Sequence, residues 1–164
     1  MKIIITESQY KRILREEKEQ KVLRIPSLKF FNDDWNLLQK FLESKGNPPY
    51  SIVGDLDLTP TSIEYLGNLT SVGGNLDLFG TPVKILGNLQ SVGGYLDLRG
   101  TPIKSLGNLH SVGGWLSLEN TPIVSLGNLT SVGGTLDLRD TPLSEKYTEE
   151  EIRQMVDVGG SVHL

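Results

Sequence analysis

The chain of 164 residues contains no cysteine and only two histidines, His110 and His163. The lack of cysteine excludes disulfides, cysteine-ligated zinc sites and thiol nucleophiles. Two histidines are too few for a metal site with several histidine ligands. No apolar run approaches the ~18 residues that a membrane-spanning helix needs, and the first residues do not have the pattern of a signal peptide. We therefore expect a soluble, cytoplasmic protein that binds no metal ion, cofactor or membrane.

Positive charge is scarce beyond the first part of the chain. Residues 1–31 hold eight Lys and Arg against four Glu, whereas the remaining residues hold eight against sixteen Asp and Glu. An acidic body repels a phosphate backbone, so we do not expect a nucleic acid as partner. The basic segment itself predicts a helical N-terminal arm with charge pairs along its surface.

Glycine, in contrast, is abundant, and its distribution shows how the chain is built. Of the 18 glycines, 15 lie within residues 51–143, where a 20-residue pattern recurs without any change of length. The pattern is S-V-G-G-x-L-D-L-x-x-T-P-I-x-x-L-G-N-L-x, and its copies begin at Ser51, Ser71, Ser91, Ser111 and Ser131. A fixed period of this length predicts a solenoid of stacked coils.

Residues 95–114 illustrate one coil. Leu96 and Leu98 alternate with polar residues, which predicts a short, half-buried strand. Pro102 then ends strand pairing, because proline has no N–H to donate. The period leaves no room for a long helix, so we expect an irregular or 3-10 return segment in which glycines supply left-handed backbone.

Stacking would place the same position of each coil in a column, because paired strands lie ~4.8 Å apart. Two of these columns are expected to form ladders that satisfy backbone groups in the return segments. One is a hydroxyl ladder and the other an amide ladder: Thr61, Thr81, Thr101, Thr121 and Thr141, and Asn68, Asn88, Asn108 and Asn128.

The motif L-x-L-x-x-T-P-I-x-x-L-x-x-L resembles the leucine-rich repeat, with threonine where that family usually has asparagine. The period is similar to that of the short bacterial class, and the S-V-G-G-x-L-D-L segment resembles repeat proteins of tailed phages and bacteria. The resemblance covers residues 51–164. It implies an α/β repeat fold, namely a solenoid with a parallel β-sheet on its concave face, short return segments and helical caps. A parallel β-helix is the alternative architecture.

The segments that flank the repeats divide the chain further. Residues 1–31 are the basic arm, and residues 32–50 are an N-terminal cap in which Asp34 precedes an amphipathic helix that ends before Gly46. Residues 51–143 are the repeats. Residues 144–164 are a C-terminal cap, with a capping box from Thr148 to Glu151 and a last strand over residues 158–164.

The strand face is the expected binding surface, because the resemblance implies that a partner lies there. Its outward positions differ between coils and carry aromatic and charged residues, which are the types that contribute most to interfaces. We therefore predict a non-enzymatic module that binds a protein partner through Phe79, Tyr95, Arg99, Trp115, Glu119 and Arg139. The alternative interpretation is that Tyr95 and Trp115 only fill the sheet face by cross-strand packing.

A second outward column is acidic and consists of Asp57, Asp77, Asp97 and Asp137. We interpret it as a solvated, hydrogen-bonded ladder that Arg99 and Arg139 partly neutralise. A calcium site is the alternative, although one carboxylate per coil falls short of the roughly six to eight oxygens that calcium takes. We assign no catalytic residue, although His163, Asp137 and Ser117 would permit a serine–histidine–aspartate arrangement.

The two ends of the chain suggest further hypotheses. The alternative function is that of a phage virion or assembly component with residues 1–16 as a removable leader, since Leu14-Arg15-Glu16 resembles a prohead-protease site. The strand over residues 158–164 would leave an open sheet edge, which allows weak self-association with a second copy.

Overall fold

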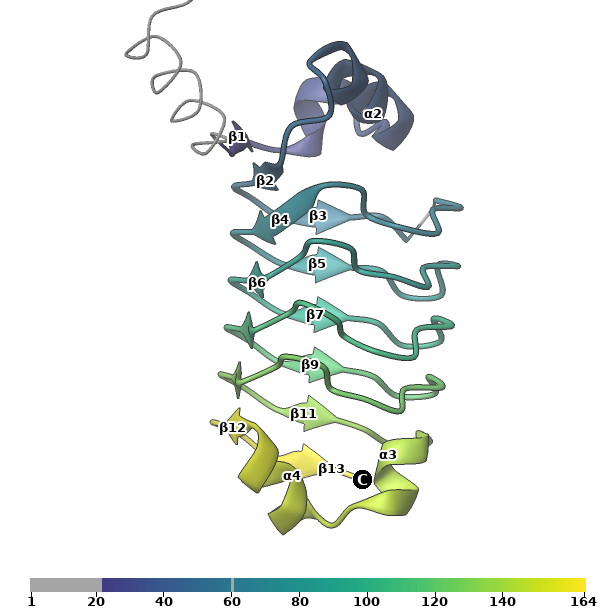
Figure 1. Cartoon of the computed structure of the whole chain (residues 1–164), viewed down its shortest axis with the longest axis vertical. Coiled ribbons are helices and arrows are strands. Elements are labelled where there is room, and N and C mark those ends of the chain that lie inside the picture. Colours follow the sequence, from purple (N-terminus) through teal and green to yellow (C-terminus); the bar gives the residue numbers. More distant parts are fainter. Residues whose placement is uncertain (1–21, 60) are drawn as a thin grey trace, which may run out of the picture.

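The computed structural model describes residues 22–59 and 61–164. They form a solenoid whose coils stack one above another along the long axis of the molecule (Figure 1). Each coil contributes one short strand to each of two parallel sheets. The repeat period sets the register, since Leu76 pairs with Leu96 in one sheet and Ser91 pairs with Ser111 in the other. The predicted solenoid of stacked parallel strands is confirmed, and the β-helix alternative also fits this arrangement.

Sheet A has seven strands in the order β1-β2-β4-β6-β8-β10-β12. Their bounds are Leu23–Ile25, Tyr50–Ile52, Leu69–Val72, Ser91–Val92, Ser111–Val112, Ser131–Val132 and Asp157–Val158. Strands β6, β8 and β10 are the Ser-Val pairs of the repeat, and a two-residue strand is too short to show an alternating period in the sequence. The second sheet is therefore a feature that the structure adds.

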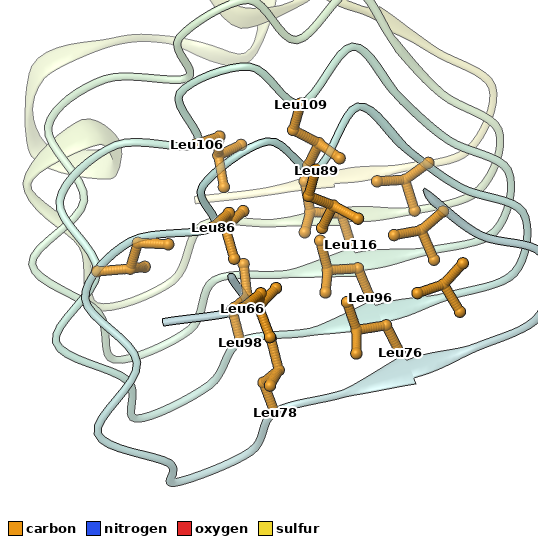
Figure 2. Close-up of a cluster of buried hydrophobic side chains, with 14 of the residues drawn as sticks. Leu66, Leu76, Leu78, Leu86, Leu89, Leu96, Leu98, Leu106, Leu109 and Leu116 are labelled. Carbon is orange, nitrogen blue, oxygen red and sulfur yellow. The ribbon is translucent and has the colours of Figure 1, made fainter. Parts of the chain in front are cut away.

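Sheet B has six strands in the order β13-β11-β9-β7-β5-β3. In chain order their bounds are Leu56–Asp57, Leu76–Asp77, Leu96–Asp97, Leu116–Ser117, Leu136–Asp137 and Val162–His163. These are the Leu-x-Leu strands that the alternating pattern predicts. The leucines point inward, where they meet the leucines of the return segments in a continuous apolar core (Figure 2).

Two polar columns differ in detail from the expected ladders. The threonine hydroxyls donate within their own coil, for example Thr101 Oγ1 to the Leu98 carbonyl at 2.7 Å. They therefore satisfy a backbone carbonyl where the strand ends, rather than one another. The asparagine column is a ladder only in part, since Asn88 donates to the Asn68 side chain at 3.2 Å while Asn108 donates to the Gly87 carbonyl.

The N-terminal end is covered by a 3-10 turn, η1 (Leu28–Phe31), and a helix, α2 (Trp35–Ser44). The predicted cap is confirmed, because the Asp34 carboxylate accepts hydrogen bonds from the Asn36 and Leu37 amides. Within residues 1–31, which the sequence assigns to the arm, strand β1 extends sheet A by pairing with β2. Residues 1–21 of the predicted arm, and with them the predicted leader over residues 1–16, fall outside the described residues.

The C-terminal end holds two short helices, α3 (Pro142–Lys146) and α4 (Glu149–Met155). The predicted capping box of α4 is confirmed, with the Glu151 amide donating to Thr148 and the Thr148 amide donating to Glu151. The single strand expected over residues 158–164 is instead two strands, β12 and β13, one in each sheet. Among the described residues, no helix combines the length and the hydrophobicity that a membrane crossing requires.

Candidate functional site

The outer face of sheet B carries the side chains that alternation predicts to point away from the core. Each of the first five strands of sheet B presents three such positions with its flanking residues and β13 presents two, so the face consists of three columns that run along the solenoid axis. The first column is Asp55, Asn75, Tyr95, Trp115, Thr135 and Ser161. The second is Asp57, Asp77, Asp97, Ser117, Asp137 and His163, and the third is Thr59, Phe79, Arg99, Glu119 and Arg139.

An aromatic stack lies in the middle of the first column. The rings of Tyr95 and Trp115 are nearly parallel, with their centroids 4.5 Å apart and their planes inclined by 5°. Earlier in the column, Asp55 and Asn75 accept hydrogen bonds from the next coil's backbone amides, at 2.7 and 3.0 Å. Tyr95 and Trp115 have no side-chain carboxylate or amide oxygen that could accept such a bond. In their coils the contact between the stacked rings replaces this hydrogen bond. Trp115 remains 38 % exposed.

A second aromatic group lies in the third column. Phe79 is 52 % exposed, and the Arg99 guanidinium lies 5.1 Å from the centroid of its ring. Arg99 also donates from Nε to both carboxylate oxygens of Asp97, at 2.9 and 3.0 Å. Four of the predicted partner-binding residues thus lie on neighbouring coils. The other two, Glu119 in the coil of Trp115 and Arg139 in the coil after it, form an ion pair at 3.3 Å.

The aspartate column is a local turn motif in each coil. Each carboxylate accepts the backbone amide two residues further on, from Asp57 with Thr59 at 2.9 Å to Asp137 with Arg139 at 3.2 Å. Such bonds shape the end of the strand where the chain turns. The expected solvation does not hold throughout, because Asp97 is only 2 % exposed. Asp97 therefore belongs to the framework of the face and not to its outer surface.

The acidic residues of this column also differ in their pKa. Burial raises the pKa of Asp77, and the charges of Asp97 and Asp57 raise it further. Burial also acts on Asp137, but hydrogen bonds and the charge of Arg139 outweigh it, so the pKa of Asp137 is lowered. The difference follows from the pairing, since Arg139 donates directly to both oxygens of Asp137.

A cleft of about 350 Å³ opens on this face beside the aromatic stack. It is lined by Arg99, Trp115, Leu116, Ser117, Glu119, Thr135, Asp137, Arg139 and His163. The sequence alone does not indicate that Ser117 lines this cleft. A signal for it exists in the sequence, since serine stands at position 117 where the other four repeats have aspartate. The smaller side chain leaves space in the column at this coil.

The same cleft brings together the serine, histidine and aspartate that the sequence allowed as a catalytic arrangement. A nucleophilic serine needs a hydrogen bond to its base, yet the buried Ser117 hydroxyl has no hydrogen-bond partner. The described residues also contain no group of three or more histidine, aspartate or glutamate side chains placed to hold a metal ion.

Comparison with protein-family models, with curated proteins and with solved structures found no match to this chain.

Proposed function

We propose that the chain is a non-enzymatic protein-binding module whose recognition surface is the outer face of sheet B. The observation that carries this proposal is the partly exposed Tyr95–Trp115 stack, with the Phe79–Arg99 pair on the same face. Large aromatic side chains and arginine contribute most of the binding energy in protein interfaces. Their position on a frame of short paired strands favours recognition, since little ordering is left for the moment of binding.

The charge of the face supports a basic partner. The three columns hold six carboxylates, Asp55, Asp57, Asp77, Asp97, Asp137 and Glu119, against two arginines. The negative potential acts on neighbouring groups. The pKa of Tyr95 is raised by burial and by the charges of Asp77 and Asp97. Complementary charge steers association and weakens it at high ionic strength. We therefore expect a partner with lysine and arginine around its contact residues.

Selection from a random peptide library against the immobilised chain tests this function. We expect enrichment of peptides rich in lysine and arginine, with binding that weakens as salt is added. Trp115→Ala should weaken binding of the enriched peptides by at least about tenfold, which is typical for loss of a hot-spot side chain. Arg99→Ala should be combined with Asp97→Asn, because Asp97 would otherwise be buried without its partner.

The matched control is Val124→Ala, which removes an exposed apolar side chain from the return segment. It should bind the peptides as the unaltered chain does. Equal binding by Trp115→Ala and by the unaltered chain would contradict the proposal, as would enrichment of acidic peptides. Thermal melting of each variant confirms that the solenoid is intact.

The finer assignments rest on the sequence resemblance. The leucine-rich-repeat type is supported by the 20-residue period and the inward leucines. The phage or bacterial source, the cytoplasmic location and the alternative role in a virion stay predictions. Mass spectrometry of purified phage particles would separate a virion component from a binding module.

A further inference from the structure

The aromatic stack on sheet B is open on one side. Tyr95 covers one face of the Trp115 ring, and the rings are almost parallel. The next position of the column belongs to Thr135, whose small side chain does not continue the stack. Both Trp115 and Thr135 line the cleft of about 350 Å³. The cleft therefore offers the uncovered face of Trp115 to a further flat group, at the place where a third ring of the stack would lie.

The lining of the cleft also includes a polar group without a partner. Ser117 also lines the cleft and is only 5 % exposed. Among the described residues, its Oγ is the one buried side-chain oxygen or nitrogen that has no hydrogen-bond partner. A buried hydroxyl without a partner costs free energy that a ligand hydroxyl can recover. The serine side chain has a single χ1 bond, and its staggered rotamers place the hydroxyl in different directions.

The charges around the cleft are balanced. Arg99 and Arg139 face Glu119 and Asp137, and Arg139 pairs with both carboxylates. A charged side chain would meet a like charge on one wall, so a neutral group is favoured. Guanidinium groups beside an aromatic ring are favourable, as Arg99 already shows with Phe79.

We propose that this cleft receives a tyrosine side chain of the partner. The tyrosine ring stacks on the open face of Trp115, and its phenol hydroxyl exchanges a hydrogen bond with Ser117 Oγ. The ring is flat and neutral, and it carries one hydroxyl for the one unpartnered hydroxyl of the cleft. The inference rests on the proposed function, because it names a contact residue of the partner that sheet B binds.

Two soluble probes that differ by a single hydroxyl test the proposal, namely N-acetyl-tyrosinamide and N-acetyl-phenylalaninamide. The chain has two tryptophans, so NMR resolves the indole N–H of Trp115 from that of the buried Trp35, which serves as internal reference. The tyrosine probe should shift the Trp115 signal alone. The phenylalanine probe should bind about fivefold more weakly, as expected for loss of one hydrogen bond.

Ser117→Ala should remove the difference between the two probes while the phenylalanine probe keeps its affinity. Ser91→Ala, the same change in sheet A, is the matched control and should preserve the difference. Methyl β-glucopyranoside is a third probe, because a sugar ring also stacks on tryptophan. Tighter binding of the sugar would overturn the proposal, and so would equal binding of the first two probes to the unaltered chain.

The outcomes also separate this inference from the proposed function. If Trp115→Ala abolishes binding of selected peptides but the tyrosine probe leaves the Trp115 signal unchanged, the tyrosine assignment is wrong and the recognition face stands. If both tests fail, the recognition face is wrong as well.

Discussion

At the residue scale, one sequence position has different electrostatic roles in different coils. Asp77 and Asp137 both follow the inward leucine of a strand and both accept the amide two residues ahead. Asp77 has carboxylates as neighbours along the column, so its pKa is raised by burial and then by those charges. Asp137 is also affected by burial, yet Arg139 lowers its pKa. The presence or absence of an arginine partner in the third column therefore decides whether the pKa of the aspartate is lowered or raised.

This contrast predicts opposite effects of removing each charge. A lowered pKa means that Asp137 stabilises the fold above its ordinary value of about 3.9 and loses that effect as the pH falls through the folded value. Asp137→Asn should lower the melting temperature by about 2 °C at neutral pH, as expected for a partly exposed ion pair. The difference should vanish in strong acid.

Asp77→Asn is the matched comparison, because the asparagine oxygen can still accept the Phe79 amide. A raised pKa means that the charged form costs stability at neutral pH and that acid relieves the cost. The variant should therefore melt at the same temperature or slightly higher at neutral pH. Thermal unfolding at both pH values checks the pair, and a drop for Asp77→Asn as large as that for Asp137→Asn would contradict this account.

At the element scale, the corner between the two sheets depends on glycine for lack of space. A Cβ on Gly113 would lie 2.1 Å from the Gly93 carbonyl oxygen, and the same distance recurs between Gly133 and Gly113. Gly107, in contrast, needs glycine for its backbone, since its φ is +56° and nothing lies within 4 Å of its Cβ position. The repeat therefore requires glycine at these two positions for different physical reasons, namely lack of space at Gly113 and a left-handed backbone at Gly107.

Gly113→Ala should be the more damaging change, because the added Cβ would clash with the backbone of the preceding coil. We expect a loss of about 3 kcal/mol or more in the free energy of unfolding, as for overpacking that forces backbone shifts. Gly107→Ala should cost about 1–2 kcal/mol, the cost of a left-handed conformation in a residue with a side chain. Urea unfolding measures the free energy of unfolding of both variants. Equal losses would contradict the lack of space at the corner between the two sheets.

At the scale of the whole molecule, the Arg153 side chain caps the last coil at the end of sheet A. Each coil's paired glycine amides donate to two carbonyls of the coil before it, for example Gly159 to Val132 and Gly160 to Gly134. At the last coil the Arg153 guanidinium takes over this role, donating to Val158 O at 2.9 Å and Gly160 O at 2.8 Å. One side chain thus replaces the two amides of a further coil.

This capping predicts how the edge behaves when it is uncovered. Arg153→Ala exposes two carbonyls that match the pairing pattern of another coil, so a second copy can pair there. We expect concentration-dependent dimers in analytical ultracentrifugation, stronger than any self-association of the unaltered chain. Lys104→Ala, which removes an exposed positive charge from a return segment, should not change the oligomeric state. A monomeric Arg153→Ala variant at high concentration would contradict the capping role.

Much of this architecture is predictable from local patterns. The fixed 20-residue period predicts the stacking, and the Leu-x-Leu alternation predicts the strands of sheet B. The caps of α2 and α4 are predictable because Asp34 and Thr148 stand at the start of amphipathic segments. The five-residue helix α3 was not predicted, since so short a segment has no period to detect.

The sequence by itself determined the repeat, its register and the alternation of inward leucines with the residues between them, because these depend on spacing along one chain. The tertiary structure alone decided three other features: the second sheet, the cleft above Ser117, and the capping of the last coil by Arg153. Each of these depends on contacts between residues of different coils or elements. The small size of Ser117 leaves a hollow only because larger side chains on neighbouring coils stand around it.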